Sequence, residues 1–163
     1  MADPYDVGMS NATVVANATL IIVHSATGVN RGSILEVLRV TVTQQGTATS
    51  QQLGVIVGQK ASAFGTYVSA TPSPSTIGGA ASGITGGTAG AAGNAGVNAS
   101  AEGAGAVTNY FAEGFNNLNG FLWVPVPEER LIVPPDTAVI VKLVGTPTTL
   151  TGWNANLTYM ELN

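Results

Sequence analysis

The sequence contains no cysteine and only one histidine, His24. The lack of cysteine excludes disulfide bonds, thiolate catalysis and thiolate metal sites. One histidine cannot supply a metal site of two or more imidazoles, and His24 ends the apolar run Leu20–His24, where a hydrogen-bonded structural histidine is expected. The sequence therefore predicts no catalytic residue set, no metal site and no cofactor.

Charge is scarce as well. Charged residues make up 9% of the chain, against about 25% in a typical soluble domain, while 45% are hydrophobic and the mean hydropathy is +0.30. Nine acidic and five basic residues give a net charge of -4. Nucleic-acid binding requires clustered basic side chains, and the five basic residues are scattered: Arg31, Arg39, Lys60, Arg130 and Lys142. We expect no nucleic-acid partner.

Long hydrophobic runs are also missing. A membrane-spanning helix needs roughly 18 consecutive apolar residues, and the strongest runs, 20–23 and 138–144, are much shorter. Residues 1–6 carry neither the basic nor the apolar part of a signal peptide, so we expect synthesis in a cytoplasm and no membrane partner. Permanent subunit interfaces are depleted in charge. The composition therefore predicts a homo-oligomer.

What the sequence does contain is a strand pattern. Short runs rich in Val, Ile, Thr and aromatic residues are bounded by Gly, Pro, Asn and Ser, with no helical period of any length. In residues 34–43, alternation places Leu38, Val40 and Val42 on a core face. Residues 11–163 are predicted to form a single antiparallel β-sandwich or jelly roll, an all-β fold. Residues 1–10 are predicted to be a short polar N-terminal arm.

Residues 71–106 have a different composition. Two prolines follow Thr71, and twenty of the 29 residues from 78 to 106 are Gly or Ala. Such a segment has few large side chains to offset the entropic cost of ordering. We expect a long Pro/Gly/Ala-rich loop inserted into the sandwich. Two alternatives remain open, a mobile excursion and a segment that packs flat against a neighbouring subunit.

Two groups of residues are candidates for chemistry or recognition. Glu128 and Glu129 are adjacent, so they point to opposite faces of an extended segment. A solvated or salt-bridged turn, with Arg130 as the partner, is favoured over a catalytic carboxylate pair. Phe121 and Trp123 share a face of a predicted strand, and we expect such aromatic residues to fill the core or an interface.

A resemblance appears in the second half of the chain. Residues 121–143 read FLWVPVPEERLIVPPDTAVIVKL, and they are followed by a Pro-containing turn at 145–147 and a closing strand that ends near residue 162. This order, after a Gly-rich middle, resembles small jelly-roll proteins encoded among the head genes of tailed bacteriophages. The resemblance implies a capsid decoration or cement protein, commonly trimeric, on the outer surface of the virion.

The expected function is therefore structural and not enzymatic. Each trimer would bridge adjacent subunits of the major capsid protein, and no small-molecule substrate is expected. The candidate residues for a protomer or capsid interface are Tyr5, Arg31, Tyr110, Phe121, Trp123, Glu128 and Arg130. The alternative is a head- or tail-fibre module that binds host surface glycans through exposed aromatic side chains.

Overall fold

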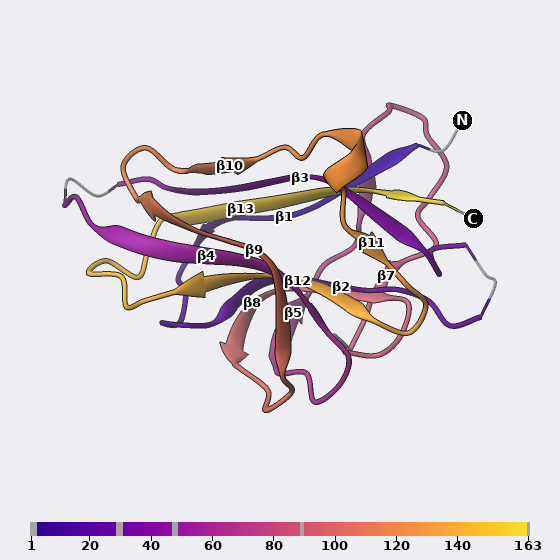
Figure 1. Ribbon diagram of the computed structural model, residues 1–163, viewed down its shortest axis with the longest axis horizontal. Helices are drawn as coiled ribbons and strands as arrows, with labels where there is room; N and C mark the ends of the chain where they lie inside the picture. Colours follow the sequence, from indigo (N-terminus) through magenta and orange to yellow (C-terminus); the bar gives the residue numbers. More distant parts are fainter. Residues whose placement is uncertain (1–2, 29–30, 47–48, 89, 163) are drawn as a thin grey trace.

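The computed structural model describes residues 3–28, 31–46, 49–88 and 90–162. Two β-sheets pack face to face (Figure 1), and all strand pairings are antiparallel except that of β7 with β8. The first sheet contains, in spatial order, β10 (Phe121–Trp123), β3 (Leu35–Gln44), β13 (Trp153–Glu161), β1 (Pro4–Ala12) and β6 (Ser73–Pro74), with β11 (Ile132–Val133) also paired to β3. The predicted all-β sandwich is confirmed.

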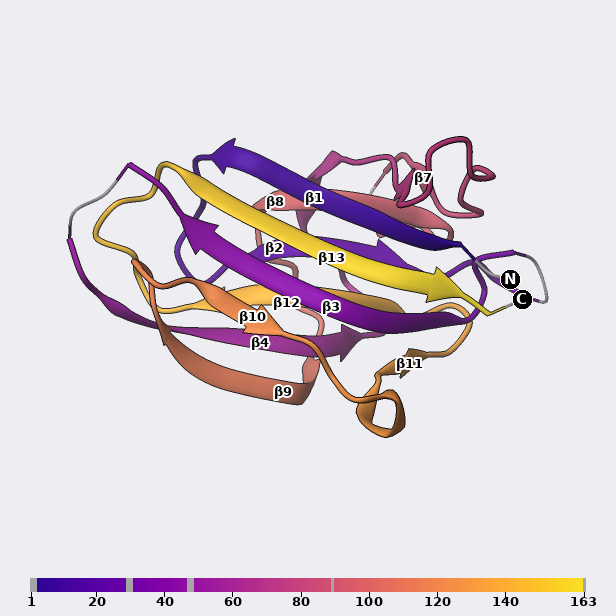
Figure 2. The same ribbon diagram turned by 90° about the horizontal axis from the view of Figure 1, so that it is seen from above.

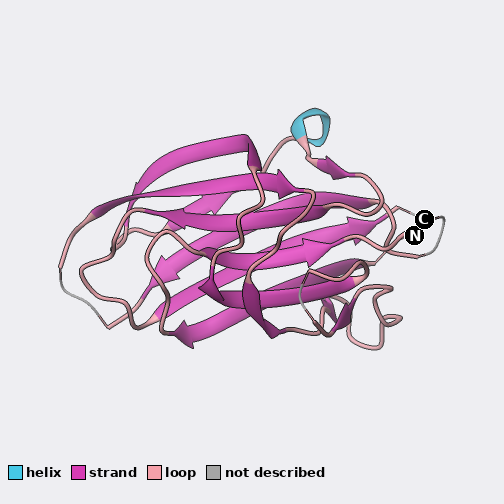
Figure 3. Ribbon diagram, turned by 90° about the horizontal axis from the view of Figure 1, so that it is seen from below, coloured by secondary structure: helices cyan, strands magenta, loops and turns pink. Residues whose placement is uncertain are grey.

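The second sheet has one more strand than the first. Its spatial order is β5 (Thr66–Ser69), β8 (Asn94–Ala101), β2 (Thr19–His24), β12 (Ala138–Val144), β4 (Gln52–Lys60) and β9 (Val107–Asn116), with β7 (Thr85–Gly86) paired to β8. Figure 3 shows the molecule from below, with the 3-10 helix η1 (Pro127–Glu129) in cyan. Across the described residues, no helix is long and apolar enough to cross a membrane.

Four antiparallel pairs define the topology. β1 pairs with β13, β2 with β12, β3 with β10 and β4 with β9, so the first strand lies beside the last and the others nest between them. Folding this nested hairpin into two sheets produces a jelly roll. In Figure 2 the strands β1, β13, β3 and β10 of the first sheet lie next to one another in that order. The strands β5 to β8 are inserted between β4 and β9.

The core between the sheets is built from aliphatic side chains and a few large rings. Trp153, Tyr5 and Tyr159 are the largest fully buried side chains, and the rings of Tyr5 and Tyr159 lie 5.8 Å apart. The rings of Trp153 and Phe115 are almost perpendicular, with centroids 6.5 Å apart. Such tilted and edge-to-face arrangements are the ones that aromatic pairs prefer.

The N-terminal segment differs from its prediction. Residues 4–12 are not an arm but strand β1, which pairs with β13 on one side and β6 on the other. Tyr5, Val7 and Met9 alternate along it and are buried in the core. The period of two is a strand signal, which the intervening Asp6, Gly8 and neighbouring Pro4 obscure in a segment this short.

We predict that Tyr5→Phe lowers the free energy of unfolding by about 1–2 kcal/mol, because it removes both part-buried hydrogen bonds of the hydroxyl group. The Tyr5 hydroxyl donates to the carbonyl of Ala80 at 3.2 Å and accepts from Arg31. Urea unfolding measures the loss. Tyr110→Phe is the matched control, since the Tyr110 hydroxyl bonds Gln59 at an exposed site and should change stability by less than about 0.5 kcal/mol. Equal effects of the two substitutions would contradict the docking of β1.

The Gly/Ala-rich segment is also more ordered than its composition suggests. Residues 71–106 contain β6, β7 and β8, and β8 is an internal strand between β5 and β2. Ala95, Val97 and Ala99 of β8 are buried. Small residues are needed where the backbones meet, because a Cβ added at Gly103 would overlap the carbonyl of Ala63. The segment extends the sandwich of its own chain, so the prediction of a simple loop is wrong.

Two carboxylates attach the inserted segment to the rest of the fold. Glu102 accepts hydrogen bonds from Lys60 Nζ at 3.0 Å and from the backbone amide of Thr19 at 2.8 Å. At the other end, Glu161 of β13 accepts from the Gly83 amide at 2.9 Å and from Arg31 Nε at 3.0 Å. The insertion is therefore fixed to both sheets by charge-assisted hydrogen bonds, which are stronger than neutral ones.

Strand β3 departs from the alternation expected from its sequence. Arg39 pairs with Thr158, but Val37 pairs with the next residue, Tyr159, so Leu38 is an extra residue in a β-bulge. The bulge reverses the pattern, so that Val37 is fully buried and Leu38 only partly so. The prediction of Val40 as a core residue is confirmed.

Candidate functional site

The structure divides the seven candidate interface residues into two places. Four of them line one surface hollow beside the edge strands β9 and β10: Tyr110, Trp123, Glu128 and Arg130. Phe121 lies buried beneath this hollow. Tyr5 and Arg31 meet each other elsewhere, in the network around Glu161.

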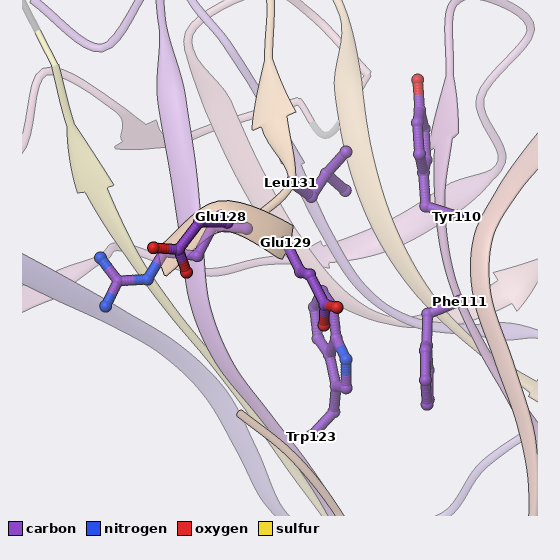
Figure 4. A pocket seen from close by; sticks show the side chains of 7 residues that line it. Tyr110, Phe111, Trp123, Glu128, Glu129 and Leu131 are labelled. Atoms are coloured by element: carbon purple, nitrogen blue, oxygen red, sulfur yellow. The ribbon is translucent and has the colours of Figure 1, made fainter. Parts of the chain in front are cut away.

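The hollow is walled by aromatic rings and rimmed by charge. Its volume is about 380 Å³, and it is lined by Tyr110, Phe111, Trp123, Glu128, Glu129, Arg130 and Leu131 (Figure 4). The Trp123 ring stacks on Phe111 with centroids 5.3 Å apart and planes inclined by 23°. The centroid of the Phe111 ring lies in turn 6.1 Å from that of Phe121. This continuous packing fixes the floor of the hollow to the core.

The sequence explains why the chain leaves the sheet here. Strand β10 pairs with β3 over three residues only, and Pro125 and Pro127 follow, which cannot donate the backbone hydrogen bonds of a ladder. Pro127 begins η1, whose first turn contains Glu128 and Glu129, as expected where a helix N-terminus favours negative charge. Strand β11 then rejoins β3. The segment between β10 and β11 therefore forms an arch that carries the two acids.

Arg130 does not pair with its acidic neighbours, contrary to the prediction. Its Nη1 lies 2.9 Å from Oε1 of Glu36 on β3, so the pairing fixes the end of the arch to the sheet. Glu128 and Glu129 have no ion pair within the described part of the chain. In Figure 4, Glu129 points toward the Trp123 ring and Glu128 points away from it. The hollow is therefore negatively charged.

Exposed apolar side chains occur on the arch and on the two short strands that flank it. The exposed fraction is 65% for Leu122, 60% for Val124, 54% for Val126 and 48% for Ile132. We call these four residues, with the lining of the hollow, the β9–β10 face. β9 and β10 are the terminal strands of their two sheets, and Phe115 of β9 contacts Phe121 of β10 at 6.0 Å. Exposed aliphatic side chains grouped on one segment are a feature of interaction sites.

Tyr5 and Arg31 have structural roles in the described chain. Tyr5 is 0% exposed, so its prediction as an interface residue is wrong. Arg31 is half exposed, but it donates to the buried Glu161, which also binds Ser82 and Gly83. Near Glu161, burial raises the pKa of Tyr159 well above its ordinary value. These partners are far apart in sequence, and no local pattern indicates them.

His24 lies in a buried environment, as predicted. Its Nδ1 is 2.9 Å from the carbonyl oxygen of Gly90, and its ring lies 4.8 Å from that of Phe64. Asp136 approaches Nε2 at 3.5 Å. In the residues that the structure describes, no three His, Asp or Glu side chains are grouped so that they could hold a metal ion.

Several residues of the β9–β10 face were not identified from the sequence. Phe111 and Leu131 line the hollow, and Val124 and Val126 are exposed beside it. The signal that could have identified Val124 and Val126 is the Val-Pro-Val-Pro run at 124–127, because prolines exclude these valines from the interior of a sheet.

Comparison with known proteins found no matching family model, no matching curated protein and no matching solved structure.

Proposed function

We propose that this chain is a structural protein of a bacteriophage particle, which decorates the outside of the capsid as a trimer and cements adjacent capsid subunits. The observation that carries the proposal is the β9–β10 face, where aliphatic side chains are exposed around an aromatic hollow. In the proposed arrangement this face lies against the shell. The proposed role is structural and involves no enzymatic activity.

Three further features support the proposal. Jelly rolls are frequent in viral capsid proteins, and the nested strand pairs have that topology. The chain is poor in charge, as permanent interfaces are. The resemblance of residues 121–143 to phage head proteins includes the arch and Trp123, but not Tyr110 and Phe111 of β9. Cementing would be mechanical, because burial of apolar surface at a seam favours the assembled shell and raises the barrier to rupture.

Light scattering and sedimentation test the proposal together. We expect light scattering to give a particle mass about three times the 16.4 kDa of one chain at micromolar concentration. We also expect the purified chain to sediment together with phage capsids that were assembled without it. Val124→Asp/Val126→Asp should stay trimeric and lose shell binding, because it places charge in an apolar contact. Ile77→Asp, at a fully exposed site outside the face, should bind normally. A stable monomer that does not bind the capsids would refute the proposal.

A second candidate function is a head- or tail-fibre module that binds host glycans. The half-buried Trp123 beside Tyr110 and two carboxylates favours it, since stacking rings and hydrogen-bonding acids are suited to sugars. Trp153→Phe would leave Trp123 as the one tryptophan emitter. Titration of that variant with host surface polysaccharide should then change the emission, and an unchanged spectrum would remove this candidate.

A further inference from the structure

We infer that the hollow of the β9–β10 face binds a lysine or arginine side chain of a second, different protein. The inference rests on the proposed function, because it takes the occupant to come from a protein surface against which the face packs. Beyond the proposed function, the inference specifies that the side chain bound in the hollow is basic and that it belongs to a different protein. Three features carry it: the charge balance of the chain, the aromatic walls and the aliphatic surroundings.

The chain itself has no basic side chain to spare. Its five lysines and arginines all lie within 4 Å of a carboxylate of the same chain, in the pairs Arg31–Glu161, Arg39–Asp6, Lys60–Glu102, Arg130–Glu36 and Lys142–Glu102. A second copy could fill the hollow only by breaking one of these pairs. We therefore take the cation to come from a different protein.

Two of the acids without a basic partner, Glu128 and Glu129, line the hollow. Among the described residues, Glu113 of β9 and the η1 residues Glu128 and Glu129 have no ion pair. The remaining acids without a Lys or Arg partner lie away from the face, with Asp3 near the N-terminus and Asp136 against His24. Glu128 and Glu129 therefore place negative charge without a basic partner at the hollow. Such a field attracts and orients a basic partner.

The walls of the hollow suit a cation. A Lys or Arg group over the face of Trp or Tyr is attracted by the ring quadrupole, and Trp is the strongest partner. Here the Trp123 ring stacks on Phe111, and Glu129 points toward the Trp123 ring (Figure 4). A guanidinium entering the hollow would meet both a ring face and a carboxylate. Arginine is also among the residues that most often anchor protein interfaces.

The surroundings favour a protein over a sugar. The exposed aliphatic side chains of the arch and its flanking strands are Leu122, Val124, Val126 and Ile132, which offer no hydrogen bonds to hydroxyl groups. They match instead the apolar contacts that surround an anchor residue and exclude water from it. A basic side chain with aliphatic neighbours is therefore the complementary partner.

The test uses two peptides and the full chain. The probe is Ac-Val-Leu-Arg-Leu-Val-NH2, and the reference replaces Arg by Gln. Binding is followed by NMR at the indole N–H of Trp123. We expect the Arg peptide to shift this signal and the Gln peptide to bind about tenfold more weakly, since a charge-assisted contact is lost. Added salt should lower the affinity of the Arg peptide, because the site is exposed to solvent and its charges are screened.

Matched variants locate the site. Glu129→Gln should reduce Arg-peptide affinity about tenfold, whereas Asp3→Asn, with the same change in net charge, should leave it unchanged. Equal affinity of the two peptides, or no effect of Glu129→Gln, would overturn the inference, as would a response to neutral oligosaccharide alone. If shells bind the chain while the Arg peptide does not, this inference fails and the proposed function stands. If the Arg peptide binds while shells do not, the capsid assignment fails.

Discussion

Replacing residues 61–106 with a two-residue Asn-Gly turn is expected to leave a chain that no longer folds cooperatively. The replacement is geometrically permitted, because Lys60 and Val107 are register partners at the ends of β4 and β9 and Asn-Gly closes such hairpins. A dispensable loop would tolerate this deletion. The structure predicts the opposite result, because the deleted segment supplies strands to both sheets.

The expected effect follows from what the deletion uncovers. Every residue of β2 is buried, and β2 would lose its partner β8 and become a sheet edge. The core would lose Ile84 and Val97, while Ile22 and Ile140 would lose the covering rings of Phe64 and Tyr67. Each such apolar side chain contributes about 1.5–3 kcal/mol when buried. The sum is comparable with a typical total stability of about 5–15 kcal/mol.

Circular dichroism during thermal unfolding measures this outcome. The deletion variant should show no cooperative transition, or should aggregate through the exposed edge of β2. A second deletion variant that also carries Lys60→Met removes the buried charge which the deletion leaves unpaired. It should remain unfolded as well. A wild-type transition in either variant would show that the insertion is peripheral.

Glu102→Gln is expected to lower the free energy of unfolding by about 3 kcal/mol, in the range for breaking a buried ion pair from one side. The Lys60 side chain is 0% exposed, and its Nζ bonds Glu102 and the carbonyl of Gly103. Removing the carboxylate charge leaves a buried ammonium group without a counter-charge. Lys60→Met/Glu102→Gln should recover most of the loss, because neither charge is then buried.

The same pair makes stability depend on pH. Burial by itself would raise the pKa of Glu102, but the hydrogen bonds from Lys60 and Thr19 lower it below its usual value of 4.5. This contribution is therefore complete above about pH 4.5 and is lost as the pH falls through the lower pKa of the folded protein. Urea midpoints of the wild type should fall on acidification by more than those of Glu102→Gln. Parallel pH profiles, or a cost of Glu102→Gln below 1 kcal/mol, would contradict the network.

Regular strands were predictable from local pattern, and interruptions of that pattern were not. The strand pattern at residues 34–43 matches β3, Leu35–Gln44, to within one residue at each end, because its β-branched run is bounded by turn residues. The bulge at Leu38 follows instead from the pairing of β3 with β13. Strand β8 was missed because its buried side chains are mainly alanine, which gives no hydrophobic period. Its order comes from the strands on either side of it.

The candidate site was predictable in part for the same reason. The run from Phe121 to Arg130 contains rings, prolines and acids in sequence, so its role outside the sheet has a local signal. Phe111 stacks on Trp123 only because β9 and β10 are the edge strands of the two sheets and lie close to each other. The choice of Glu36 by Arg130 likewise depends on β11 returning to β3. Long-range topology decided these contacts.

An electron cryo-microscopy map of the intact phage particle tests the central claim most directly. We expect trimers on the outer surface of the shell, with Leu122, Val124 and Val126 covered by capsid protein and a basic side chain of that protein against Trp123. A particle that lacks the chain, or one in which the β9–β10 face is open to solvent, would contradict the account.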